Sequence, residues 1–477
     1  MKSTSRPGGL AACALCILAA AGCASLGDSK THALERDPAS LEAARTLESR
    51  AAQAAWPAGD WWKSFGDPQL DALEQESLRT SPSLALAEAR VRRAQALAQE
   101  AGAVLKPQVN GSASITRDRF GENYIFPPPF GGAWYTQPSA RLDFGYEFDF
   151  WGRNRASVRA ALGEAKAAEV DVGAARLVLS VAIAQAYLEL ESQYTQRDVA
   201  QATLDQRVKL RDLTAQRVSA GLDSQVELKQ AETAIPQTRE QIARHDEAIA
   251  LGRHRIAALL GEGPDRGLDV QRPHTRPAHV GLPSTLPADL IGRRPDVAAQ
   301  RLRIEAAGAT IDVAKASFYP NVSLSAYVGL QSLGLSQFLS GGSAIAGVGP
   351  ALSLPIFEGG RLRANLESKQ ADYDAAVEQY NGAIVEAVRE VADSVASMRA
   401  LDVRRGEQRQ ALASAQAAYD LALIRYREGL GNYLQVLSAE TPLLAQRSLG
   451  AELDARERVL SVNLIRALGG GYEGVKS

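Results

Sequence analysis

Cysteine and histidine are scarce in this chain of 477 residues. All three cysteines, Cys13, Cys16 and Cys23, lie near the N-terminus, and the five histidines show no metal-ligand spacing. The sequence contains no GxxxxGK phosphate loop and no G-x-S-x-G elbow. We therefore expect a protein that is not an enzyme and has no cofactor and no metal.

The net charge is small, and the chain has few long apolar runs. The formal charge is only −2, so no nucleic-acid partner is expected. Beyond the N-terminal stretch, no run of ~20 apolar residues occurs, which argues against a membrane-spanning helix. Aromatic residues make up 6% of the chain and apolar residues 45%. Much of the apolar fraction is alanine, the best helix former.

The N-terminus has the pattern of a secretion signal. Lys2 and Arg6 precede an apolar run, and small residues lead up to Cys23. We expect a signal peptide over residues 1–22. Ala20-Ala21-Gly22-Cys23 is similar to a bacterial lipobox, although Ala20 replaces its usual leucine. This similarity implies lipidation of Cys23, a tether over residues 23–66 and sorting to the outer membrane. The alternative is an ordinary signal peptide cleaved nearby.

Two halves of the chain repeat one another. Pro82 and Pro107 have the same separation as Pro295 and Pro320. Farther on, Gly152-Arg153-Asn154-Arg155-Ala156 matches Gly360-Arg361-Leu362-Arg363-Ala364 at an offset of 208. The repeats are predicted at 67–261 and 288–470. The proline-rich stretch 262–287 would connect them.

Each repeat contains two stretches of period-two alternation, the pattern of a strand with one apolar face. The predicted strands cover about 108–118, 138–150, 320–331 and 343–355. Roughly 9–11 residues suffice for a tilted membrane-spanning strand. Four strands cannot close a barrel, which takes about eight or more, so the chain must associate. The pattern alone leaves a dimer and a trimer open.

Each repeat also contains a long helical hairpin, predicted at 152–260 and 359–468. Gly221 and Gly429 are expected to end the outgoing helices. Ser224 and Asn432 are expected to cap the returning ones. The second hairpin keeps a seven-residue apolar period, typical of left-handed coiled-coil packing, with a polar interruption at Arg405 and Gln408.

These features together resemble the TolC-type outer-membrane efflux proteins, in the lipoprotein branch that serves resistance-nodulation-division pumps. The motifs that carry the resemblance are Trp61-Trp62-Lys63-Ser64-Phe65-Gly66-Asp67-Pro68-Gln69-Leu70, Phe150-Trp151-Gly152-Arg153-Asn154-Arg155, Arg294-Pro295-Asp296-Val297, Pro355-Ile356-Phe357-Glu358-Gly359-Gly360-Arg361 and Arg425-Tyr426-Arg427-Glu428-Gly429. They span nearly the whole mature chain.

The resemblance implies an α+β fold and a homotrimer. Four strands per chain, twelve in all, would form a β-barrel in the outer membrane, anchored by lipid. A long α-helical barrel would continue it into the periplasm. Its hairpin tips would meet a periplasmic adaptor protein that links them to an inner-membrane pump.

The resemblance also assigns roles at the tips. Leu434 matches a constricting leucine ring, whereas the acidic ring of the family falls on Ser438, with Glu440 as a nearby substitute. Arg425 and Tyr426 would make the polar ties that hold this gate closed. The positions expected at the adaptor-contacting tips are Arg217, Gly221, Leu222, Ser224, Glu227, Gly429, Leu430, Asn432 and Tyr433.

The predicted function is therefore a passive exit duct for small molecules that an inner-membrane transporter pumps. Long hairpins would equally suit a periplasmic adaptor or a coiled-coil adhesin, and these remain the alternatives. The paired two-faced strands and the duplication favour the duct.

Overall fold

The computed structural model describes residues 30–47, 55–123, 125, 129–278, 281 and 290–474. The predicted signal peptide over residues 1–22 and Cys23 lie outside these residues. The chain divides into two compact units. Among the described residues, unit 1 contains those within 30–35, 91–168 and 300–380, and unit 2 contains those within 36–90, 169–299 and 381–474.

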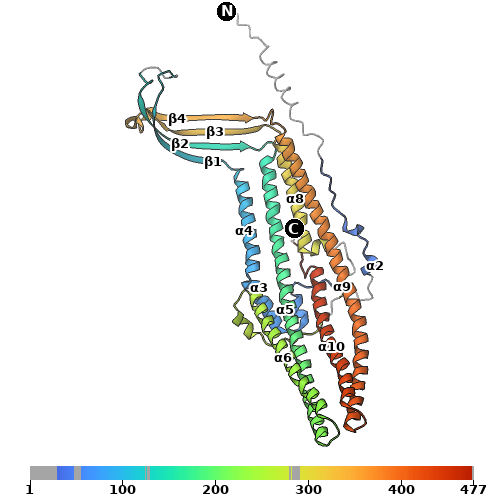
Figure 1. Cartoon of the computed structure of the whole chain (residues 1–477). Helices are drawn as coiled ribbons and strands as arrows, with labels where there is room; N and C mark the ends of the chain where they lie inside the picture. Colours follow the sequence, from blue (N-terminus) through green and yellow to red (C-terminus); the bar gives the residue numbers. More distant parts are fainter. Residues whose placement is uncertain are drawn as a thin grey trace, which may run out of the picture. The chain divides into compact units, whose positions relative to one another are not determined.

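The sheet lies in unit 1 and has four antiparallel strands in chain order (Figure 1). They are β1 (Gln108–Arg119), β2 (Trp134–Phe148), β3 (Asn321–Gln331) and β4 (Ala344–Ser353). β2 begins four residues before its expected start, because Trp134 to Gln137 still pair with Arg119 to Thr116. Polar and apolar residues do not alternate over residues 134–137. The alternation therefore predicted a later start than the strand has.

The helices are α2 (Ala44–Leu47), α3 (Pro68–Thr80), α4 (Pro82–Ala103), α5 (Arg153–Ser219), α6 (Gln225–Leu260), α7 (Leu290–Arg293), α8 (Pro295–Ala316), α9 (Arg361–Arg427) and α10 (Tyr433–Ala467). At 67 residues each, α5 and α9 would be about 100 Å long, given a rise of about 1.5 Å per residue.

Within unit 1, α5 and α8 pack closely through small residues. A Cβ added at Gly163 would lie 3.0 Å from Cβ of Ala306. Arg159 and Asp312 form an ion pair of 3.0 Å between the same helices. Ile311, Phe318 and Leu366 are buried together where α8 meets α9.

The main core of unit 2 joins the N-terminal segment to α5 and α6. Phe65, Leu70, Tyr187, Ile256 and Leu260 are almost completely buried in it. Asp67 caps α3, because its side chain accepts a hydrogen bond from the backbone amide of Gln69. Its second carboxylate oxygen accepts a hydrogen bond from the Tyr187 hydroxyl at 2.8 Å. The tryptophan-rich motif at 61–70 therefore anchors the chain before the first repeat.

The polar interruption in the seven-residue period of α9 faces α10. Arg405 forms ion pairs with Asp454 at 3.0 Å and Glu457 at 2.7 Å. The Gln408 amide donates to the Gln446 carbonyl oxygen at 2.8 Å. The interruption is thus a polar contact within the second hairpin, flanked by buried apolar positions such as Leu401.

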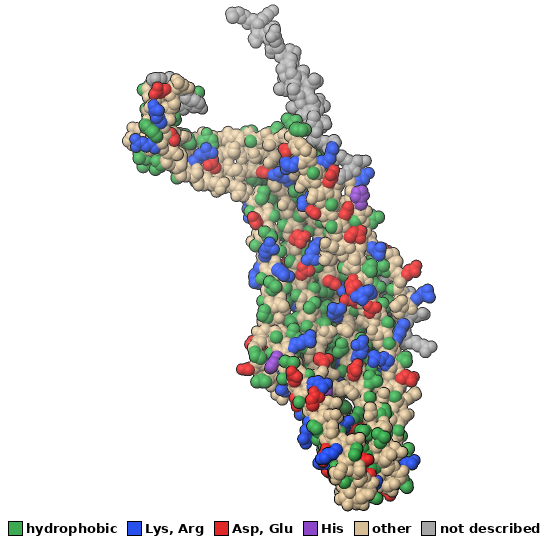
Figure 2. Space-filling view, in the orientation of Figure 1, with side chains coloured by type: hydrophobic (Ala, Val, Ile, Leu, Met, Phe, Trp, Pro, Cys, Tyr) green, Lys and Arg blue, Asp and Glu red, His purple; other side chains and the backbone are tan. Residues whose placement is uncertain are grey.

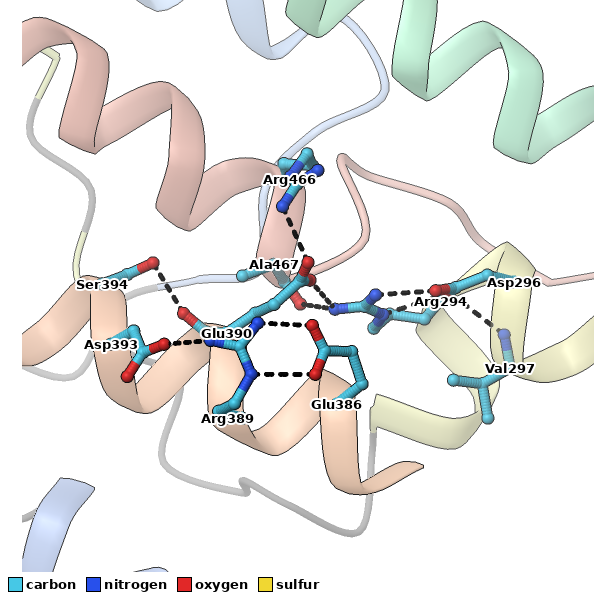
Figure 3. Close-up of polar contacts among 10 residues, drawn as sticks. All are labelled: Arg294, Asp296, Val297, Glu386, Arg389, Glu390, Asp393, Ser394, Arg466 and Ala467. Carbon is cyan, nitrogen blue, oxygen red and sulfur yellow. Dashed lines mark hydrogen bonds and ion pairs between the residues drawn. The ribbon is translucent and has the colours of Figure 1, made fainter. Parts of the chain in front are cut away.

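A buried arginine ties the start of α8 to the middle of α9 and the end of α10 (Figure 3). Arg294 pairs with Asp296 at 2.6 Å and with Glu390 at 2.7 Å, and donates to the Ala467 carbonyl oxygen at 3.1 Å. Burial alone would lower the pKa of Arg294, but its pairing with the two carboxylates outweighs this and raises the pKa. Arg466 adds a second ion pair to Glu390 at 2.7 Å. The Arg-Pro-Asp motif at 294–296 is therefore a structural clamp.

Lys and Arg side chains alternate with Asp and Glu over the helices on the face drawn in Figure 2, without a large area of one sign. Within the described part of the chain, no helix combines the length and apolar character that crossing a membrane requires.

Candidate functional site: the two-faced sheet and the hairpin tips

The register of the sheet gathers the apolar residues of all four strands on one side, here called the apolar face. One row across the sheet contains Val109, Phe144, Ala326 and Val348. Its full set is Val109, Gly111, Ala113, Ile115, Pro138, Ala140, Leu142, Phe144, Tyr146, Phe148, Val322, Leu324, Ala326, Val328, Leu330, Ala344, Ala346, Val348, Pro350 and Leu352. These twenty positions carry no charged residue. The face is nevertheless exposed in places, since Val348 is 76% exposed.

The opposite side, here called the polar face, carries mostly small, hydroxyl and charged residues. Arg141 and Asp143 form an ion pair there, and the Arg141 guanidinium lies 4.6 Å from the ring centroid of Tyr327. Glu147 pairs with Arg153 at 2.7 Å. The strand was predicted to reach residue 150, but Asp149 lies beyond β2 and accepts hydrogen bonds from the backbone amides of Asn154 and Arg155 at the start of α5.

Both hairpin tips are built as the sequence predicts. Gly221 and Gly429 have φ of +75°, and the following amides, of Leu222 and Leu430, bond back to the carbonyl oxygens of Arg217 and Arg425. A capping box starts each returning helix, with Ser224 and Glu227 in α6 and with Asn432 and Gln435 in α10. Pro236 and Pro442 lie inside these helices.

A buried polar cluster joins the two hairpins just above their tips. Asp223, in the first turn, accepts hydrogen bonds from Arg217 at 2.8 Å and from the Tyr426 hydroxyl at 2.5 Å. Arg217 also donates to the Tyr426 carbonyl oxygen at 2.7 Å, and its guanidinium lies 4.5 Å from the Tyr426 ring centroid. The Tyr426 hydroxyl lies 3.0 Å from that of Thr214. We call Arg217, Asp223, Thr214 and Tyr426 the tip cluster.

The protonation states of the tip cluster favour these bonds. Burial alone would raise the pKa of Asp223, but hydrogen bonds from Arg217 and Tyr426 outweigh it and lower the pKa. Burial, reinforced by the neighbouring Asp223, raises the pKa of Tyr426 to about 12. At neutral pH the phenol is therefore a donor and the carboxylate an acceptor.

A second polar contact joins the hairpins farther from the tips. Arg207 and Glu440 form an ion pair of 3.4 Å, and the Gln206 amide donates to Glu440 at 3.3 Å. Arg207 also donates to the Thr238 hydroxyl at 2.8 Å. Glu440 is only 1% exposed, so it is not a substitute for an accessible acidic ring.

The structure separates the predicted tip residues by exposure. Leu222, Leu430 and Leu434 are exposed to 63%, 72% and 63%, and Ser438 is exposed one helical turn beyond Leu434. Arg217 and Tyr433 are buried, which corrects their assignment to a partner-contacting surface. Arg217 is held by the tip cluster, and Tyr433 packs edge-on against Tyr426.

Of the two predicted gate ties, only Tyr426 reaches the other hairpin. Arg425 is exposed and donates to the Leu430 carbonyl oxygen at 3.3 Å, within its own hairpin. Asp223 and Thr214 were not among the residues predicted from the sequence. Asp223 follows a Gly-Leu turn in the first repeat, where the second repeat has Gly431. This departure from the repeat was the available signal.

Comparison with known proteins identifies the family to which this chain belongs. The family model for outer membrane efflux proteins matches residues 73–262 and 286–470. The chain belongs to the outer membrane efflux protein family. It is therefore an outer-membrane efflux channel protein, with the α+β fold predicted from the sequence.

Curated relatives in this family cover most of the chain. It is 40% identical over 378 residues to the fusaric acid resistance protein FusA of Burkholderia cepacia, covering 78% of this chain and 71% of the relative. It is 32% identical to the multidrug resistance outer membrane protein MdtP of Escherichia coli K12, covering 95% of this chain and 94% of the relative.

Solved structures in the family have the same fold. The outer membrane protein VceC of Vibrio cholerae is 40% identical, with a TM-score of 0.81, and the match covers 88% of this chain and all of VceC. The outer-membrane channel OprN is 27% identical, with a TM-score of 0.83, and the match covers 94% of this chain and 98% of OprN.

Proposed function

We propose that three copies of this outer membrane efflux protein form a continuous exit duct for small organic molecules. The observation that carries the proposal is the uncharged apolar face, which spans all four strands in register. It runs from Pro138 to Phe148 along β2, about 33 Å at roughly 3.3 Å per residue. A tilt of about 40° reduces this to about 25 Å, the height of the lipid-facing band of outer-membrane barrels.

The sheet edges support association. β1 and β4 each have only one neighbouring strand in the described sheet, and open edges are not tolerated in lipid. Three chains would supply twelve strands, enough to close a barrel. The polar face, with Arg141 and Asp143, would then line a water-filled lumen.

The helical hairpins would continue the duct into the periplasm, where their exposed tips would contact an adaptor protein and, through it, an inner-membrane pump. Leu222, Val226 and Leu430 are exposed apolar positions at the tips that could make this contact. Leu434 and Ser438 would face the lumen at the closed end, where the tip cluster holds the second hairpin against the first. Opening would require the Tyr426–Asp223 bond to break.

The proposal includes a passive mechanism, in which the pump supplies the energy and the duct catalyses no reaction. Cys23 would carry the lipid anchor, with residues 23–66 as the tether and 262–287 as the connector between the repeats 67–261 and 288–470. The names of FusA and MdtP, for fusaric acid and multidrug resistance, support organic compounds as the cargo.

The decisive experiment compares arginine substitutions at two neighbouring residues on opposite faces of β3. Ala326 lies in the middle row of the apolar face, and Ser325 lies at the same depth on the polar face. Ala326→Arg should cost about 2–4 kcal/mol, because charges on the lipid face are most costly at midplane. We expect Ala326→Arg to abolish the heat-resistant trimer in outer-membrane fractions, and Ser325→Arg to preserve it. Equal effects of the two substitutions would refute the proposal.

A further inference from the structure

Two arginines continue the apolar face of β1 beyond its last apolar residue. Arg117 pairs with Thr136 and Arg119 pairs with Trp134, so both side chains follow Ile115 on the same side of the sheet. The charges therefore begin immediately where the apolar face ends. This end of the sheet carries the β1–β2 connection and lies opposite the end that leads into α5.

We propose that Arg117 and Arg119 bind the phosphate groups of glycolipids in the outer leaflet of the outer membrane. The inference rests on the proposed function, because it requires the apolar face to contact lipid. Arg117 lies two residues beyond Ile115, about 7 Å farther along the strand. A tilted strand places it at headgroup height, where charged side chains are tolerated.

The two guanidinium groups differ in availability. Arg117 is exposed, and its guanidinium makes no hydrogen bond or ion pair with the residues that the structure describes. Arg119 is half exposed, donates to the Gly132 carbonyl oxygen at 3.1 Å and pairs with Glu122 at 3.2 Å. Asp118 lies on the opposite side of the strand, where it accepts a hydrogen bond from Gln137 at 3.4 Å, so the side that carries the arginines has two cations and one carboxylate, Glu122. Guanidinium groups bind phosphate bidentately, so Arg117 is the principal ligand.

Neighbouring residues favour a lipid over a free anion. The Trp134 indole is 60% exposed beside Arg119, and exposed tryptophans occur at membrane interfaces. Ile115 is 67% exposed directly below Arg117 and would contact the acyl chains. A phosphorylated headgroup and its chains would thus meet cationic, aromatic and aliphatic surface in that order.

The opposite end of the sheet has a different character. Arg153 and Arg155 near that end are paired with Glu147 and Asp149. Trp151 and Tyr319 stack there with ring centroids 4.6 Å apart, and Phe150 is 65% exposed. The arginines near that end are therefore neutralised, whereas Arg117 is unpaired among the described residues at the end that would face the phosphate-rich outer leaflet.

The test uses the full-length protein in phosphatidylcholine nanodiscs that contain diphosphorylated lipid A. Lipid A retained by the protein after lipid exchange is measured by mass spectrometry. We expect the double variant Arg117→Gln/Arg119→Gln to retain roughly tenfold less, because hydrogen bonds between ionised groups are the stronger kind. Arg93→Gln, which removes an exposed arginine from α4, should retain as much as the unmodified protein.

Two further arms test the chemistry. With dephosphorylated lipid A, the double variant and the unmodified protein should retain equal amounts. Millimolar inorganic phosphate should not displace lipid A, and displacement would overturn the assignment to a lipid. Equal retention of the diphosphorylated lipid by the double variant would also overturn it. Trimer insertion is measured in the same nanodiscs, so failure of the unmodified protein to insert would instead refute the proposed duct.

Discussion

Removing the Tyr426 hydroxyl should favour the open state of the duct. In Tyr426→Phe the ring can keep its place, but Asp223 loses a hydrogen bond of 2.5 Å. A hydrogen bond to an ionised group contributes about 1.5–3 kcal/mol. If the bond exists only in the closed state, its loss shifts the equilibrium roughly 10- to 150-fold per chain toward the open state.

Single-channel conductance in planar bilayers measures this shift. The Tyr426→Phe channel should show a higher mean conductance than the unmodified channel at pH 7. Tyr194→Phe is the matched control, because it removes a tyrosine hydroxyl from α5 at a position farther from the tip and outside the tip cluster. Unchanged conductance in Tyr426→Phe would refute the role of the tip cluster in closure.

The same bond predicts a response to acid. The pKa of Asp223 is lowered in the closed state. The ionised carboxylate therefore stabilises the closed state fully above the ordinary aspartate pKa of 3.8, and this stabilisation is lost as the pH falls through the lowered pKa. Conductance should therefore rise below pH 3.8 in the unmodified channel. In Asp223→Asn this titration is absent, so the acid-induced rise should be reduced.

Three further predictions concern the constriction and the core of unit 2. Leu434→Ala should raise the conductance, because it removes an exposed apolar side chain from the expected ring; an unchanged value would remove Leu434 from the constriction. Glu74 is fully buried, and burial raises its pKa to about 9, so it stays protonated in the folded protein while it ionises in the unfolded chain; the free energy of unfolding therefore falls as the pH rises from 4.5 toward 9. Glu74→Gln should therefore stabilise the protein by on the order of 3 kcal/mol near pH 7, with little effect at pH 4, in urea unfolding. Arg294→Met should cost about 3–5 kcal/mol in the same assay, because Glu390 loses its most buried partner, and adding Glu390→Gln should recover part of the loss.

The architecture of the sheet could be predicted because strand residues alternate between two environments. Residues such as Leu142 and Phe144 repeat at period two, and the register between strands follows once their apolar residues must share a face. The tip turns were equally predictable, since Gly221 and Ser224 act through their own backbone neighbourhood.

The tip cluster was harder to predict because its members are distant in the chain. Asp223 sits in a turn, where an aspartate is common, and only the packing of the two hairpins brings it to Tyr426. The burial of Tyr433 and Glu440 had the same origin: sequence spacing placed them near the tip, but the facing helix determines which side chains are enclosed.

The tip cluster also limits what each half of the chain can do alone. The first repeat supplies the acceptor, Asp223, but has Val218 where the second has Tyr426. The second supplies the phenol but has Gly431 where the first has Asp223. A tube assembled from copies of either half would contain hairpins with no partner for this bond. The tip cluster therefore depends on sequence differences between the two repeats.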